Sequence, residues 1–253
     1  MNNNIVPQLR SRPAIDANHT NVWYMGEGCT TDGTQILPDV GSVTLVRTSG
    51  GGVIQTGYSL FDTQKSAYAT ENTVSGSTRF SAALSPTIGT SQAFTLESII
   101  LFPPETVNTV PQYIGAFLVS VVNPSPPPST TDYAQILYRE ATTRPGFLTQ
   151  RNSSGYNSSY SSFGASNDQV VPGLPSHFML TWEPAGASGT QNFYIDGRLL
   201  TTYTGGLAGD RFAAFNAVTV NFICGASLAD LRISNIARSQ LYAIEATRSM
   251  RAL

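Results

Sequence analysis

The stretch HFMLTWEPAGASGTQNFYIDGRLLTTYTGGLAG, residues 177–209, decides the fold. Within it, Phe178, Leu180 and Trp182 place large side chains on alternate residues, which is the period of a β-strand with one buried face. The Asp-Gly pair at 196–197 then separates two apolar runs. Such a pair is a strong hairpin signal, because both central positions of a type I′ turn need a positive φ. We therefore expect a strand followed by a tight hairpin.

The rest of the chain repeats this pattern of short strands and turns. Residues 183–190 are rich in Gly, Ala and Ser and predict a loop. Residues 94–102, FTLESIILF, predict a strand buried on both faces, because nearly every side chain is apolar. Ser239 is expected to cap a short helix that ends at Met250, with Leu241 and Ile244 facing inward. Further strands are expected at 22–24, 43–47, 53–61, 66–70, 112–122, 134–140, 146–151, 217–224 and 227–234. Strands spaced about ten residues apart are typical of an all-β sandwich or barrel.

Three segments carry a family resemblance in the same order along the chain. They are VWYMGEGCTTDGTQILPDVG (22–41), SHFMLTWEPAGASGTQNFYIDGRLL (176–200) and ASLADLRISNIARSQLYAIEA (226–246). Together they resemble the laminin G-like members of the concanavalin A-like lectin and glucanase superfamily. The resemblance implies one domain over residues 21–253, a two-sheet antiparallel β-sandwich (concanavalin A-like jelly roll) with a short C-terminal helix. Residues 1–20 are polar and are expected to be an N-terminal arm, either a frayed terminus or an assembly tail.

The same resemblance implies a structural calcium ion. In the superfamily an Asp of the closing strand often binds it, together with main-chain carbonyls near the opening Glu-Gly. The matching positions here are Asp230, Glu27 and Gly26, and oxygen ligands suit Ca²⁺. The alternative is that Asp230 only hydrogen-bonds a turn. The opening and closing segments also contain Cys29 and Cys224, which are expected either to form a bridge or to be buried thiols.

Composition excludes several classes of function. Only 12% of the residues are charged, about half of the usual ~25%. The net charge is −2 and the basic residues form no cluster, so a nucleic-acid partner is not expected. No run approaches the ~18 apolar residues that a membrane span needs, and no secretion signal is visible at the N-terminus. These features favour a virion surface location, or otherwise an extracellular one.

The chemistry-bearing residues do not form a catalytic pattern. Sandwich glycosidases of the superfamily place carboxylates two and five residues apart on one strand, so that they share a face. The acidic residues here are dispersed, although carboxylates from distant strands could still meet. His19 and His177 are the two histidines, and packing explains His177 better than catalysis. Two histidines and two cysteines far apart do not support a zinc site. We therefore expect no enzyme activity and no catalytic residues.

Residues 152–168, NSSGYNSSYSSFGASND, have the composition of a recognition loop. Aromatic rings supply rigid contact area and small polar residues supply hydrogen bonds. The alternative is a mobile hairpin tip, or rings that fold onto the protein's own surface. The candidate ligand-binding residues are Tyr156, Asn157, Tyr160 and Phe163.

The sequence leaves three functions open. The first is a non-enzymatic virion structural protein, such as a bacteriophage capsid decoration or tail-associated protein. It would use the sandwich for assembly or surface adhesion, with capsid or tail proteins and further copies of itself as partners in a homo-oligomer. The second is a carbohydrate-binding module in which Tyr156, Tyr160 and Tyr203 stack on sugar rings. The third, a glucanase-type hydrolase or polysaccharide lyase, is disfavoured by the spacing of the acids.

Overall fold

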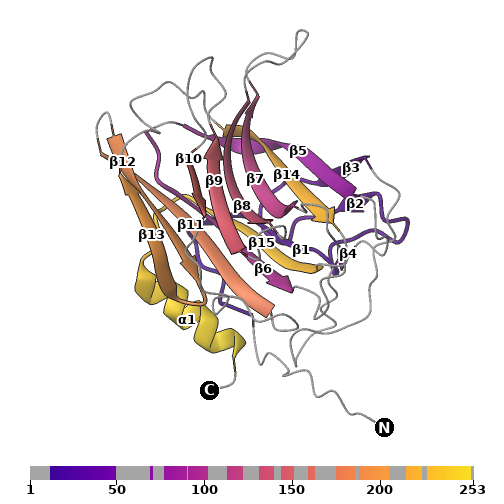
Figure 1. Cartoon of the computed structure of the whole chain (residues 1–253). Coiled ribbons are helices and arrows are strands. Elements are labelled where there is room, and N and C mark those ends of the chain that lie inside the picture. The colour runs from indigo at the N-terminus through magenta and orange to yellow at the C-terminus, as the bar shows by residue number, and fades with distance from the viewer. Residues whose placement is uncertain are drawn as a thin grey trace.

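A computed structural model describes most of the sandwich. It covers residues 12–49, 69–70, 77–89, 91–101, 113–121, 131–139, 144–150, 159–162, 175–185, 188–204, 215–223 and 227–251. For residues 113–121, 131–139, 144–150 and 159–162 it describes the backbone alone. The expected strand at 53–61 and the residue Cys224 lie outside these ranges. In the described residues the chain forms two antiparallel sheets and one C-terminal helix, as the sequence predicts (Figure 1).

The first sheet has seven strands, and all its pairs are antiparallel. Its order is β1 (His19–Tyr24), β15 (Ser227–Ser234), β6 (Phe94–Leu101), β11 (Pro175–Ala185), β12 (Ser188–Ile195) and β13 (Arg198–Thr204), with β4 (Ala69–Thr70) pairing with β15. Strands from both ends of the chain, β1 and β15, therefore lie side by side, and β15 also pairs with β6.

The second sheet has eight antiparallel strands. Its order is β10 (Ser159–Ser162), β9 (Arg144–Gln150), β8 (Thr131–Arg139), β7 (Tyr113–Val121), β14 (Phe215–Ile223), β5 (Ser77–Ile88), β3 (Leu45–Ser49) and β2 (Gln35–Ile36). The expected hairpin of residues 134–140 and 146–151 is confirmed as the pair β8 and β9, which run a few residues earlier than expected.

An apolar core lies between the two sheets. Its largest side chains come from both sheets and are almost fully buried: Trp23, Phe80, Phe94, Phe178, Trp182, Phe193 and Phe215. Phe94 and Phe215 meet edge to face with ring centroids 5.6 Å apart, an arrangement that aromatic pairs favour. The prediction that β6 is buried on both faces is confirmed, because every residue from 94 to 100 is buried.

The predicted hairpin at Asp196 and Gly197 is confirmed. Asp196 has φ 51° and Gly197 has φ 79°, the left-handed values that a type I′ turn requires. The turn joins β12 to β13 and packs on the C-terminal helix. A Cβ atom on Gly197 would lie 2.9 Å from the backbone of Ile244, so only glycine fits there.

Two predictions for β11 are wrong. First, residues 175–182 are all buried, because the face away from the core is covered as well. Second, residues 183–185 and 188–190 are paired strand residues and not loop, because β11 and β12 pair up to Ala185 and Ser188. The small residues there serve close packing, since a Cβ on Gly189 would come within 2.1 Å of the Trp182 ring.

The strand β5, twelve residues long, was not predicted from the sequence. Its core-facing residues Phe80 and Leu84 alternate with exposed positions, but Ala82 between them is small. Pro86 near its end further weakens the strand signal.

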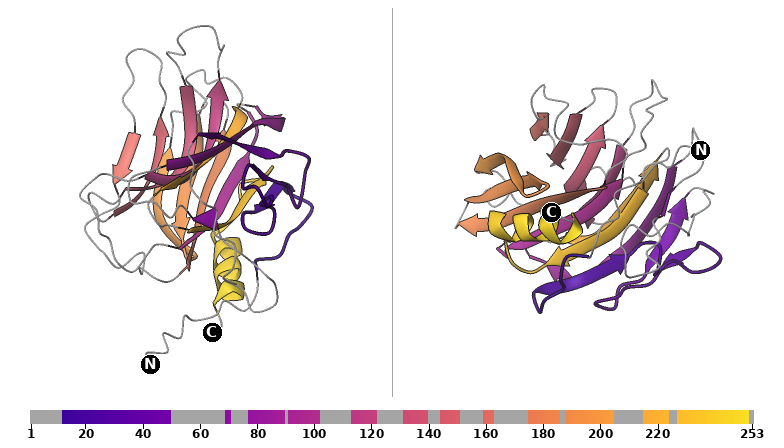
Figure 2. Two further views of the ribbon diagram at one scale, coloured as in Figure 1. Left: turned by 90° about the vertical axis from the view of Figure 1, so that its right-hand side faces the viewer. Right: turned by 90° about the horizontal axis from the view of Figure 1, so that it is seen from below.

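The C-terminal helix α1 (Gln240–Met250) is capped as predicted, because the Ser239 side chain accepts a hydrogen bond from the Tyr242 amide. It lies on the side of the seven-stranded sheet away from the other sheet (Figure 2), where Ala243 packs on Met179 and Tyr194. The inward orientation expected of Leu241 is wrong, because this side chain is 61% exposed. No helix in the described ranges has the length and apolar character needed to span a membrane.

Candidate functional site

The outer face of the seven-stranded sheet, away from the core, carries a group of buried charged residues. A bulge in β15 creates part of it. Leu228 and Leu231 both join the core although they are three residues apart, because the register against β6 shifts between Leu228 and Asp230. The shift turns Asp230 and Arg232 to the outer face, since alternate residues of a strand point to opposite sides.

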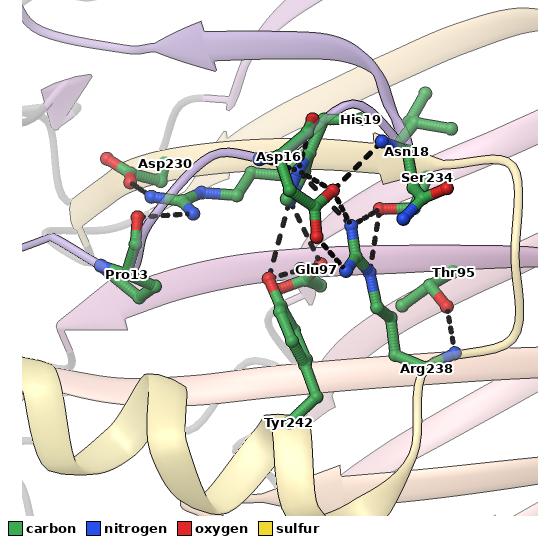
Figure 3. A network of polar contacts seen from close by, with 12 residues as sticks. Pro13, Asp16, Asn18, His19, Thr95, Glu97, Asp230, Ser234, Arg238 and Tyr242 are labelled. Atoms are coloured by element: carbon green, nitrogen blue, oxygen red, sulfur yellow. Dashed lines mark hydrogen bonds and ion pairs between the residues drawn. The ribbon is translucent and has the colours of Figure 1, made fainter.

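Glu97 of β6 lies at the centre of this group (Figure 3). Its carboxylate is 3.1 Å from His177 Nε2 and accepts a hydrogen bond of 3.1 Å from the Tyr242 hydroxyl. His19 Nε2 lies 3.7 Å from the same carboxylate and 3.3 Å from the Tyr242 oxygen. Both histidines of the chain and the helix thus converge on one carboxylate that is 1% exposed.

The charges in the group hold Glu97 ionised. Burial alone would raise the pKa of Glu97, but the hydrogen bond with His177 and the nearby His19 and Arg232 outweigh it. The pKa of this carboxyl therefore lies well below its ordinary value. Burial and the negative charge of Glu97 raise the pKa of Tyr242, so its hydroxyl stays protonated and donates. Burial lowers the pKa of Arg232, yet Asp230 and Glu97 raise it by more.

Arg238 links the segment before α1 to the N-terminal segment. Its guanidinium pairs with both carboxylate oxygens of Asp16 (Nη1–Oδ2 2.5 Å, Nη2–Oδ1 2.7 Å) and donates to Ser234 Oγ. It also lies 4.3 Å from the centre of the Tyr242 ring, within range of a cation–π interaction. The hydrogen bond from Arg238 lowers the pKa of Asp16 well below its ordinary range.

Arg12 occupies the position where the sequence predicts calcium. Its Nε donates to Asp230 Oδ1 (3.1 Å) and its Nη1 to both oxygens of Glu27 (3.0 Å each). Arg232 Nη2 donates to the other Asp230 oxygen (2.7 Å), and Gly26 lies in the turn after β1. The structure thus brings Asp230 and Glu27 to the same guanidinium group, as expected if the opening and closing segments are neighbours.

Guanidinium groups, however, take up both Asp230 oxygens. In the part of the chain described, no three His, Cys, Asp or Glu side chains are arranged to hold a metal. The residues do not fit Ca²⁺ while Arg12 is in place, and calcium binding stays a prediction that requires Arg12 to leave.

The arrangement joins parts of the chain and gives a substrate no access to its acids. Glu97 and Asp230 lie on the same face of neighbouring strands, so two acids from distant parts of the sequence share this face. Arg232 lies opposite Glu97 in the register and is bonded to Asp230. Asp230 is fully buried and Glu97 nearly so, and both are saturated by donors within the protein.

Of the four predicted ligand residues, Tyr160 alone lies in the described ranges. Tyr160 falls in β10, opposite Leu148 of β9, and only its backbone is described. Tyr156, Asn157 and Phe163 lie outside the described residues. Cys29 has a free thiol, and burial raises its pKa.

Sequence reasoning missed the buried network itself. Its clearest sequence signals are Glu97, the one charged residue in an otherwise uncharged strand, and the pair Asp230 and Arg232 in the apolar stretch 228–233.

Comparison with known proteins identifies the fold. No protein-family model matches the chain, and no curated protein matches it. Among solved structures, it is similar to the binding domain of botulinum neurotoxin serotype D, with a TM-score of 0.59 and 10% identity over 91% of this chain and 50% of that one. The binding domain of Paraclostridial mosquitocidal protein 1 gives 0.57 and 12% over 92% and 52%. The receptor-binding domain of botulinum neurotoxin mosaic serotype C/D gives 0.59 and 9% over 92% and 52%.

The chain thus spans about half the length of these structures. At such low identity the likeness concerns the fold alone, which is a lectin-like β-sandwich of the kind found in toxin binding domains.

Proposed function

We propose that this chain is a non-catalytic binding domain whose sandwich presents a surface for a glycan or a glycan-bearing receptor. The observation that carries the proposal is the state of the acids: Glu97 and Asp230 lie on one face, yet both are buried and bonded to donors within the protein. A glycoside hydrolase of the common kind needs two accessible carboxyl groups flanking its substrate. The likeness in fold to binding domains, one of them called receptor-binding, also supports a binding function.

We assign ligand binding to the segment 152–168, of which the structure describes the backbone of β10. Support comes from its content of Tyr, Asn, Ser and Gly, because aromatic faces stack on sugar rings and small polar side chains hydrogen-bond to hydroxyls. β10 is the last strand at its end of the eight-stranded sheet among the described elements. The residues proposed to bind are Tyr156, Asn157, Tyr160 and Phe163.

A glycan array with the full chain tests the proposal. We expect a defined set of glycans to bind, and Tyr160→Ala to weaken that binding about tenfold, the effect of losing about 1.4 kcal/mol. Tyr160→Phe is the matched control, because it keeps the ring and should keep most of the affinity. Absence of glycan binding, or glycan turnover that Glu97→Gln abolishes, would contradict the proposal.

The finer role that we propose is that of a virion component in the laminin G-like branch of the concanavalin A-like superfamily. It rests on the three sequence segments that resemble this family and on the low share of charged residues. Mass spectrometry of purified particles is the direct test. Recovery of the chain with head or tail proteins would support the role, and its recovery only in the secreted fraction of cells would contradict it.

A further inference from the structure

The N-terminal segment 12–16, RPAID, lies on the outer face of the seven-stranded sheet in the manner of a bound peptide (Figure 3). The segment is not part of a strand of the sheet, because β1 begins only at His19. The side chains of Arg12 and Asp16 bond to the sandwich, and the Pro13 carbonyl accepts a further hydrogen bond from it.

The arginine end of this segment enters a site suited to a guanidinium group. Asp230 and Glu27 receive the Arg12 donors at 3.0–3.1 Å, and the guanidinium carbon lies 3.8 Å from the centre of the Tyr24 ring. Two carboxylates and an aromatic face together match the planar donors and the stacking of arginine better than those of lysine. The Arg12 side chain is 7% exposed, so the site encloses it.

The aspartate end meets the opposite charge. Asp16 binds Arg238 through both carboxylate oxygens, and between the two ends the Pro13 carbonyl accepts a 2.9 Å hydrogen bond from Arg232 Nη1. Along the site, Arg12 of the segment meets the two acids Asp230 and Glu27. The Pro13 carbonyl then meets Arg232, and Asp16 meets Arg238. The charges of the segment and the site are therefore complementary along its length.

We propose that Tyr24, Glu27, Asp230, Arg232 and Arg238 form a peptide-binding site. It takes an extended segment with an arginine and, four residues later, an aspartate. When two molecules associate, residues 12–16 of one copy of this chain bind the site of the other copy. Every bond that the segment makes with these five residues can be made equally by the segment of a neighbouring copy, so exchange requires no new surface. Within one molecule the covalent link through residues 17–18 gives the segment a high effective concentration, which favours its own site until copies are crowded together.

A peptide-binding measurement tests the site. The full chain with Arg12→Ala and Asp16→Ala keeps the site but loses both charged anchors of its own segment. A labelled peptide of residues 10–18 should bind it saturably, and the same peptide with Arg12→Asp and Asp16→Arg should bind at least tenfold more weakly. Wild-type protein, whose site is filled, should also bind at least tenfold more weakly.

Equal binding of the two peptides, or no binding to a variant that melts cooperatively, overturns the proposal. If the double variant does not fold, Arg12→Gln alone takes its place and the same outcomes decide.

A mixing experiment tests the occupant. Glu27→Arg repels Arg12 from the site but leaves residues 12–16 intact, and the Glu27 side chain is 29% exposed, so the new group can reach solvent. This chain, labelled with a fluorescent donor, is mixed with the acceptor-labelled Arg12→Ala, Asp16→Ala chain.

Energy transfer is expected in that mixture, where one chain supplies the segment and the other the site, and at a level well above that of either chain mixed with itself. Transfer no higher than in the self-mixtures, with both chains folded, overturns exchange between copies.

Discussion

The two faces of the seven-stranded sheet are both buried, but by opposite means. On the inner face, side chains such as Leu96 and Leu180 pack against the other sheet in an apolar core. On the outer face of the same strands, Glu97 and His177 belong to a network of charges that ends on the helix and on residues 12–16. Apolar burial stabilises whatever packs well. A buried charge requires its particular partner, so the outer face fixes which segments cover the sheet.

The largest effect is expected where the network loses its central cation. Arg232→Ala would remove the buried guanidinium that bonds Asp230 and lies opposite Glu97, which should lower the free energy of unfolding by about 3–5 kcal/mol. Leu231→Ala, on the inner face of the same strand, is the matched control and should cost about 2–5 kcal/mol through its cavity. Urea unfolding measures both. A loss below about 1 kcal/mol for Arg232→Ala, the size of an exposed ion pair, would contradict buried pairing.

The next effect concerns pH and separates the two faces directly. The pKa values of Glu97 and Asp16 are lowered in the folded chain, so their contribution to stability is complete above the ordinary carboxyl pKa of ~4. It is lost progressively as the pH falls below that value. Urea midpoints should therefore drop between about pH 5 and pH 3. Glu97→Gln should flatten this dependence, and Leu231→Ala should shift the whole curve without changing its slope.

A smaller effect is expected at the start of the helix. Ser239→Ala removes the cap that accepts from the Tyr242 amide and should cost about 1 kcal/mol. It should also loosen the helix turn that carries the Tyr242 hydroxyl to Glu97. Glu245→Ala, at an exposed position of α1, is the control and should leave the melting temperature nearly unchanged. Equal melting temperatures for the two variants would show that the cap contributes little.

The smallest effect is expected from calcium. Because Arg12 binds Asp230 and Glu27, adding calcium and then a chelator should leave the Tm of the wild-type chain unchanged. In Arg12→Ala the two acids lose that cation, and calcium should then raise the Tm reversibly. A calcium-dependent Tm in the wild type would mean that the ion displaces the guanidinium.

Features that depend on residues within one element were predicted well. The Asp196-Gly197 turn, the doubly buried strand at 94–102 and the Ser239 cap each follow from residues within one element. The strand at 77–88 was missed because small residues and a proline blur its alternation. The outer network could not be read in this way, because it joins residues as distant as Arg12 and Asp230. It also depends on the bulge after Leu228, since plain alternation would place Asp230 in the core.

Hydrogen exchange of Arg238→Gln tests most directly whether the outer network attaches the N-terminal segment and the helix to the sandwich. Arg238 contacts Asp16, Ser234 and the Tyr242 ring. We expect amides in residues 12–19 and 240–250 to exchange at least tenfold faster than in the wild type, while those of β6 and β11 keep their protection. Unchanged exchange in both terminal segments, or a uniform increase that includes β6 and β11, would contradict this account.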